Sequence, residues 1–119
     1  RIREDFEYTC EILPEVQRAG IPMLVGDDFG TPLMPHGDYI SEFEVYAKQV
    51  GLSPLEVIRW ATVNPAALLG RDEDLGRVAP GAVADLVVVA GDPSVDIGTL
   101  REVKAVLQDG VVVRGSLEN

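Results

Sequence analysis

The sequence predicts an α/β fold in which helices dominate the first part of the chain and β-strands the last part. Three observations support this prediction. Apolar residues recur at helical spacing as far as Gly70, and a short apolar run at Ile21–Val25 has the length of a buried strand. Runs of β-branched residues follow a charged linker at Arg71–Asp74. The 119 residues suffice for one small domain with its own core and are too few for two.

A first helix is expected from about Glu4 to Ala19, where apolar residues recur at helical spacing and Gly20 follows in the C′ position. Pro14 lies inside this pattern. Either the helix kinks there, or a second helix begins with Pro14 at its first position. The apolar run Ile21–Val25 then forms a strand, which completes a helix-then-strand unit.

Two capping boxes predict the starts of two further helices. Ser41 pairs with Glu44 in the first box, and Ser53 pairs with Glu56 in the second. Pro54 occupies the first helical position of the later helix, where a missing N–H costs nothing. The residues expected to be buried along the two helices are Phe43, Ala47 and Val50, then Leu55, Ile58 and Thr62. The later helix is expected to be interrupted at Asn64-Pro65.

The tail is predicted to be β-rich. Ala84–Ala90 contains a continuous apolar run typical of a buried strand. Val103–Gln108 and Val111–Arg114 flank Asp109-Gly110, which is a strong signal for a two-residue hairpin turn. One helical turn is expected in the loop around Asp96-Ile97.

Charge and composition exclude several classes of partner. Twenty acidic side chains against ten basic ones give a formal net charge of -10, which argues against nucleic acid or an anionic membrane as a partner. The single cysteine, Cys10, excludes an internal disulfide and favours a reducing, cytoplasmic location. No apolar run approaches the roughly 18 residues that span a bilayer.

Two adjacent carboxylates, Asp27 and Asp28, follow Gly26 at the end of the predicted strand. In α/β enzymes the loops at the carboxyl ends of parallel strands converge on one opening, so chemistry collects there. A metal, a substrate cation or a catalytic proton would each use such a pair. An Asx-turn followed by the N-cap of the next element uses the same residue types, and the spacing leaves both interpretations open.

The single histidine, His36, lies in a Pro35–Gly37 loop a few residues further on, where it can line the same opening. One histidine and two aspartates do not complete a catalytic zinc site, which usually has three protein ligands. The chain's own residues therefore form an incomplete active site. Other polar residues have structural explanations: Glu42, Glu44 and Glu56 lie near helix N-termini, Asp85 is expected to order a turn, and Trp60 is expected in the core.

Seven short motifs occur in an order that resembles the C-terminal end of the metal-dependent amidohydrolase superfamily. The similarity is strongest to the branch of imidazolonepropionase-like and Xaa-Pro dipeptidase-like enzymes, and it covers about Gly20 to Arg114. The motifs are Gly26–Pro32, Pro35–Gly37, Gly51–Glu56, Ala61–Gly70, Leu75–Gly81, Ala84–Val89 and Gly91–Pro93.

The resemblance implies a C-terminal fragment of a distorted (β/α)8 barrel, a TIM-like barrel, followed by strands of a small β-sandwich built from both chain ends. Residues 1–74 would form the last helix–strand–helix units of the barrel, with Ile21–Gly26 as its eighth strand, and residues 75–119 would form sandwich strands. Such enzymes carry one or two divalent metals, and zinc is the metal expected here.

The resemblance also implies roles for individual residues. Asp28 matches the aspartate that binds metal and accepts a proton from the attacking water. Asp27 stands where the family often has Thr or Ser. Thr31 and His36 belong to the active-site loop, beside the small-molecule amide substrate. The implied reaction is hydrolysis of a C–N bond in a dipeptide-like, N-acyl amino acid or cyclic amide substrate.

The chain begins at Arg1 rather than at a methionine, and the family's other metal ligands are absent from it. We therefore expect a piece of a longer enzyme, inactive by itself, that needs the remainder of the amidohydrolase chain or other copies of itself. Two alternatives stay open: a non-catalytic α/β binding or oligomerisation module, and an enzyme of this fold whose substrate is not an amide.

Overall fold

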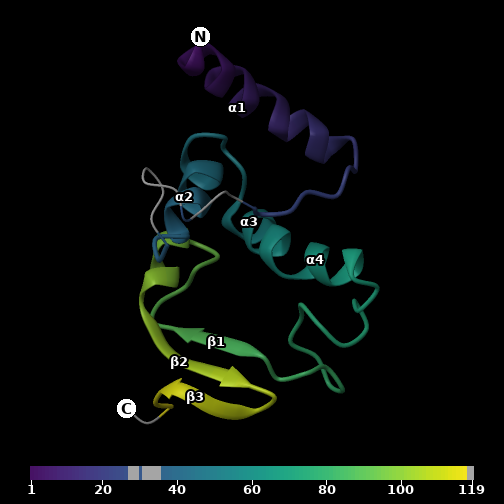
Figure 1. The fold of residues 1–119 in the computed structure, drawn as a ribbon, viewed down its shortest axis with the longest axis vertical. Coiled ribbons are helices and arrows are strands. Elements are labelled where there is room, and N and C mark those ends of the chain that lie inside the picture. The colour runs from purple at the N-terminus through teal and green to yellow at the C-terminus, as the bar shows by residue number, and fades with distance from the viewer. Residues whose placement is uncertain (27–29, 31–35, 118–119) are drawn as a thin grey trace.

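The computed structural model describes residues 1–26, 30 and 36–117. Helix α1 lies at one end of the molecule, α2, α3 and α4 pack in the middle, and a three-stranded sheet lies at the other end (Figure 1). The elements are α1 (Ile2–Arg18), α2 (Ile40–Lys48), α3 (Pro54–Ala61), α4 (Val63–Leu68), β1 (Leu86–Val89), the 3-10 helix η1 (Ile97–Arg101), β2 (Val103–Gln108) and β3 (Val111–Gly115).

Helix α1 runs as one helix through Pro14, so the alternative of a second helix beginning there is wrong. The helix ends as predicted: Gly20 has φ +75°, and the N–H of Ile21 donates to the carbonyl of Val16 at 3.3 Å. No residue of α1 is fully buried, and Gln17 near its C-terminal end donates to Glu56 of α3. Within the described residues, no helix is both long and apolar enough to cross a bilayer.

The segment Ile21–Val25 is not a strand in this structure, which corrects the prediction. A β-strand needs a neighbouring strand that pairs with its backbone. Here residues of α3 and α4 supply the hydrogen-bond partners of the segment instead. The Val25 N–H donates to the Trp60 carbonyl at 3.1 Å, and Asn64 Nδ2 donates to the Met23 carbonyl at 2.7 Å. The side chains still alternate as in a strand: Met23 and Val25 pack on the core, whereas Leu24 is 39% exposed.

The capping box predicted at Ser41 and Glu44 is wrong. Helix α2 begins at Ile40, so Ser41 lies inside its first turn and its hydroxyl donates to the Asp38 carbonyl at 2.7 Å. The Glu44 carboxylate accepts from Lys48 and Arg101 instead of turning back to Ser41. The predicted apolar side is confirmed, since Phe43 and Ala47 pack against the core. Val50 packs there too, although α2 ends at Lys48 and not at Gly51 as predicted.

The second capping box is confirmed. The Ser53 hydroxyl accepts from the Glu56 N–H at 3.3 Å, and the Glu56 carboxylate accepts from the Ser53 N–H at 2.8 Å. The break predicted at Asn64-Pro65 falls earlier, at Thr62, where φ is -131° and ψ is -78°. Pro65 lies in the first turn of α4, where backbone N–H groups have no partner inside the helix, so the missing N–H of proline costs no hydrogen bond.

Helix α3 buries Trp60, as predicted, and Ile58 packs against the same core, but the predicted burial of Leu55 is wrong. Val57 and Trp60 are 0% and 3% exposed, whereas Leu55 is 56% exposed. Both sides of α3 are apolar, so its sequence alone does not choose between them. Ile58 and Thr62 line an apolar cavity of about 550 Å³ between the helices and the sheet. The residues that bound this cavity on its other sides include Phe43, Leu75, Val89, Leu100 and Val103.

The sheet has the predicted strands and hairpin, but the prediction that β1 is a buried strand is wrong, since Val87 is 60% exposed and Val88 is 37% exposed. Its strands pair antiparallel in the order β1-β2-β3, and the hairpin turn between β2 and β3 has positive φ at both Asp109 and Gly110, as a two-residue turn of this kind requires. Asp85 has the structural role that was expected of it, but at a turn distant in sequence: its carboxylate accepts from the Asp109 N–H of this hairpin at 2.7 Å. The predicted helical turn is the 3-10 helix η1.

The main core joins η1 to the helices. Ile97 is 1% exposed and belongs to one apolar cluster with Leu52, Val57 and Trp60. The Tyr46 ring lies edge-on to Trp60, with 5.3 Å between the ring centroids. Because Ile97 is the first residue of η1, this cluster places the whole 3-10 helix against α2.

We predict that Ile97→Ala lowers the free energy of unfolding by about 2–5 kcal/mol, because it leaves a cavity in this cluster. Val95→Ala is the matched control: Val95 is 79% exposed, so its truncation should change the free energy by less than about 0.5 kcal/mol. Urea unfolding of both variants at one protein concentration measures the difference. Equal losses would show that Ile97 does not hold the core together.

Candidate functional site

The predicted site falls partly outside the described residues. Asp27, Asp28 and Thr31 lie outside them, so their predicted roles stay predictions. The two ends of the site loop are described. Gly26 ends the extended segment that packs on α3, and His36 precedes α2. The candidate site is therefore built from the residues that flank the loop and hold its ends.

His36 folds back onto the loop. Its Nε2 atom would lie 2.7 Å from a Cβ built at Gly30, so the imidazole rests against the Gly30 backbone. Gly30 has φ +108°, a conformation that favours glycine, and a side chain there would displace the ring. The Nδ1 atom lies 3.1 Å from the Tyr39 hydroxyl. The imidazole therefore lies between Gly30 on one side and the Tyr39 hydroxyl on the other.

An ionic cluster connects the end of the loop with η1. Arg101 lies 2.7 Å from Glu44 and 3.1 Å from Asp38, and Lys48 lies 2.6 Å from Glu44. Hydrogen bonds from Lys48 and then Arg101 lower the pKa of Glu44 below its ordinary value. The Glu44 carboxylate, and to a lesser degree Asp38, raises the pKa of Arg101. Sequence reasoning missed Arg101 because Asp38 is 63 residues away along the chain and no motif links the two.

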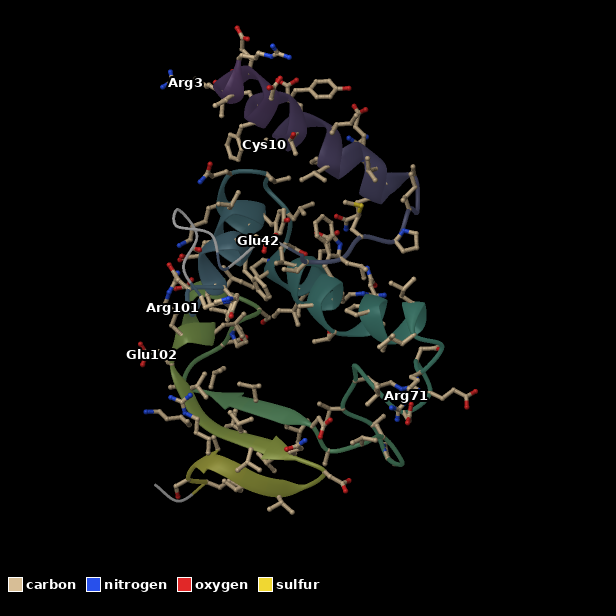
Figure 2. The ribbon with its side chains drawn as sticks, in the orientation of Figure 1. Arg3, Cys10, Glu42, Arg71, Arg101 and Glu102 are labelled. Carbon is tan, nitrogen blue, oxygen red and sulfur yellow. The ribbon has the colours of Figure 1, made fainter. Side chains whose placement is uncertain are left out.

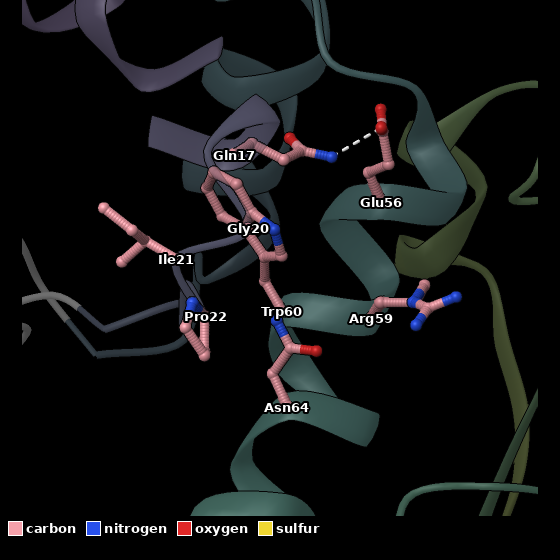
Figure 3. Close-up of a pocket in the computed structure, with 8 residues that line it drawn as sticks. All are labelled: Gln17, Gly20, Ile21, Pro22, Glu56, Arg59, Trp60 and Asn64. Carbon is pink, nitrogen blue, oxygen red and sulfur yellow. Dashed lines mark hydrogen bonds between the residues drawn. The ribbon is translucent and has the colours of Figure 1, made fainter. Parts of the chain in front are cut away.

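A separate, more polar cavity of about 370 Å³ lies at Gly20–Pro22, where the extended segment begins (Figure 3). Gln17 Nε2 donates to Glu56 Oε1 at 2.5 Å across its rim, and Trp60 lies beside it. Hydrogen bonds from Ser53, first from its N–H and then from its hydroxyl, lower the pKa of Glu56. This cavity begins at the opposite end of the segment from Gly26, so it is not the predicted site.

The described residues do not complete a metal centre by themselves. Among residues 1–26, 30 and 36–117, no three His, Cys, Asp or Glu side chains converge closely enough to hold an ion. Catalytic zinc usually takes three protein ligands, so a metal at this loop needs donors beyond those that the structure describes.

Comparison with known proteins identifies the family. Residues 9–117 match the model of the amidohydrolase family, so the chain belongs to that family. It is 30% identical to the imidazolonepropionase of Ralstonia nicotianae over 105 residues, which are 86% of this chain and 26% of that protein. It is 32% identical to the adenine deaminase of Mesorhizobium japonicum over 68 residues, which are 57% of this chain and 11% of that protein.

A solved structure shows the same fold. The match to a Xaa-Pro dipeptidase crystallised with methionine in its active site has a TM-score of 0.77 and 32% identity, and it covers 92% of this chain and 25% of the dipeptidase. The predicted resemblance is thus confirmed. The chain spans about a quarter of the length of the imidazolonepropionase and of the dipeptidase.

The lowered pKa of Glu56 generates a prediction about pH. A carboxylate whose folded-state pKa lies below 4.5 stabilises the fold above pH 4.5, and this contribution is lost as the pH falls through the folded-state value. Glu56→Gln keeps a side chain that can cap α3 but removes the charge. We predict that the variant is less stable than the wild type at pH 7 and that the difference shrinks below pH 4.5. Urea unfolding at pH 7 and pH 3 tests this, and a difference that is the same at both pH values would contradict it.

Proposed function

We propose that this chain is the C-terminal part of a hydrolase that cleaves C–N bonds in small amide or cyclic amide substrates, with water as the nucleophile. The observation that carries the proposal is the family match across residues 9–117. Relatives and structural neighbours include proteins named as an adenine deaminase, a pterin deaminase and a Xaa-Pro dipeptidase. A deaminase and a dipeptidase both break a C–N bond with water, so this reaction is the chemistry common to them.

The proposed architecture assigns residues 1–74 to the last units of a (β/α)8 barrel and residues 75–119 to strands of a small β-sandwich. The extended segment supports the first part. Met23 and Val25 pack on the helical core while Leu24 faces away, which is how a barrel strand divides its side chains between helices and interior. The antiparallel sheet supports the second part.

In this proposal Asp28 binds a divalent metal, expected to be zinc, together with ligands from the remainder of an amidohydrolase chain. A bound divalent metal lowers the pKa of water toward 7. The Asp28 carboxylate accepts the proton that the attacking water loses and can return it to the leaving nitrogen. Asp27, Thr31 and His36 line the substrate side of the loop, a role supported for His36 by its contact with Gly30, two residues after Asp28 in the sequence.

We predict that Asp28→Asn, in the complete protein, lowers turnover at least 100-fold, because general-base catalysis contributes about 10²–10⁴-fold. Asp27→Asn is the matched control and should keep most of the activity, because neighbouring side chains at a strand end point to opposite sides. Hydrolysis of a panel of Xaa-Pro dipeptides and N-acyl amino acids, with metal content measured for each variant, tests the assignment. Equal losses in both variants would overturn it.

A second prediction concerns assembly. Large apolar side chains that a barrel or sandwich would cover are exposed here: Leu24 is 39% exposed, Val111 65% and Val113 57%. Burial of a few hundred Å² of such surface contributes several kcal/mol at roughly 25 cal/mol per Å². We therefore expect the 119-residue chain alone to associate with copies of itself at low micromolar concentration. Sedimentation velocity measures this, and a compact monomer that melts cooperatively would contradict it.

A further inference from the structure

Arg101 joins two segments that lie far apart in sequence. Its Nη1 donates to Glu44 Oε2 at 2.7 Å, and its Nη2 donates to Asp38 Oδ1 at 3.1 Å. Glu44 belongs to α2, whereas Asp38 lies before the helix, at the end of the candidate site loop. Figure 2 shows Arg101 where η1 meets α2. The two donors of one planar guanidinium thus connect the loop end, the helix and η1.

The 3-10 helix η1, which ends at Arg101, is fixed in place by buried and hydrogen-bonded contacts. Ile97, at the start of η1, is 1% exposed in the main core. The Asp96 carboxylate accepts from the Gly98 N–H at 2.9 Å and caps the 3-10 helix. A Cβ at Gly98 would come within 3.2 Å of Glu44 Oε1, so the carboxylate packs closely against this turn. Arg101 therefore extends from a fixed turn rather than from a free loop.

Asp38, which Arg101 holds, lies two residues after His36. Tyr39 follows Asp38, and its hydroxyl lies 3.1 Å from His36 Nδ1. The other ring nitrogen rests on Gly30. Contacts on both sides of the imidazole thus depend on where the segment from His36 to Tyr39 lies. Arg101, in the C-terminal half of the chain, binds this segment through its ion pair with Asp38.

We propose that Arg101 is a positioning residue that holds His36 against Gly30. The part of His36 in substrate binding rests on the proposed function, but the link from Arg101 to His36 does not. A residue of the tail would thereby set the position of the imidazole. Lysine would not replace Arg101, because a single ammonium lacks the fork that meets two carboxylates from different segments.

The effect of Arg101 is expected to be local. Its side chain is 39% exposed and that of Asp38 is 61% exposed, and exposed ion pairs contribute little to global stability. Lys48 supplies the matched control, since it binds the same Glu44 carboxylate but does not contact Asp38. Loss of Lys48 removes a similar exposed ion pair and leaves the connection to the loop intact.

Chemical labelling of His36 tests the proposal. Diethyl pyrocarbonate modifies imidazole nitrogens, and His36 is the single histidine among these 119 residues, so mass spectrometry of its peptide reports on it alone. In the complete protein, Arg101→Met should raise the labelling rate of His36 about two- to five-fold, the range expected for loss of an exposed ion pair. Arg101→Lys should raise it similarly, and Lys48→Met should leave it unchanged. An unchanged rate in Arg101→Met, or an equal rise in Lys48→Met, would overturn the proposal.

A kinetic measurement separates this inference from the proposed function. With the best dipeptide or N-acyl amino acid found for the wild type, Arg101→Met should raise KM about two- to five-fold with little change in kcat, because His36 lines the substrate side of the loop. Faster labelling with an unchanged KM would show that the contact does not serve the reaction. If the wild type hydrolyses none of these substrates, the proposed function fails, while the labelling rates still decide whether Arg101 positions His36.

Discussion

The burial of Ile97 among Leu52, Val57 and Trp60 is the interaction on which the rest of the structure depends. It is an apolar contact between a one-turn helix of the tail and two segments of the helical part, and burial of a side chain of this size contributes about 1.5–3 kcal/mol. A 3-10 turn of five residues has little stability by itself. Its position against α2 therefore depends on this tertiary contact, and the ionic cluster around Arg101 follows from that position.

The extended segment before the candidate site shows how a fold can hold a strand-like conformation without a neighbouring strand. Its backbone bonds to the Trp60 carbonyl and to the Asn64 side chain, and its apolar side chains alternate between the core and the opposite face. Helices α3 and α4 thus orient the segment that leads to Asp27 and Asp28. In a barrel of the amidohydrolase type, the same orientation would deliver the aspartates to the mouth, where the chemistry of such barrels occurs.

The two ends of the site loop are held by different kinds of interaction. At Gly26 the chain leaves an apolar contact with the helices, whereas at Asp38 it is held by an ion pair with the tail. Screening by salt weakens an exposed ion pair but does not weaken apolar burial. The two ends of the loop should therefore respond differently to ionic strength, with the segment from His36 to Tyr39 as the more sensitive end.

Local sequence signals determined the features that short-range physics decides. The Ser53–Glu56 cap, the Gly20 helix end and the hairpin at Asp109-Gly110 each need only neighbouring residues or one tight turn, and each was predictable. The contact from Asp85 to Asp109 joins residues that are 24 positions apart and therefore needs the sheet. The order of the motifs also predicted the family. Tertiary structure alone decided that Leu55 of α3 is exposed, where the Glu44 carboxylate points and how Ile21–Val25 bonds its backbone. In each of these cases the local sequence allows more than one arrangement, and a partner distant in sequence, such as Arg101, Ile97 or Trp60, selects one of them.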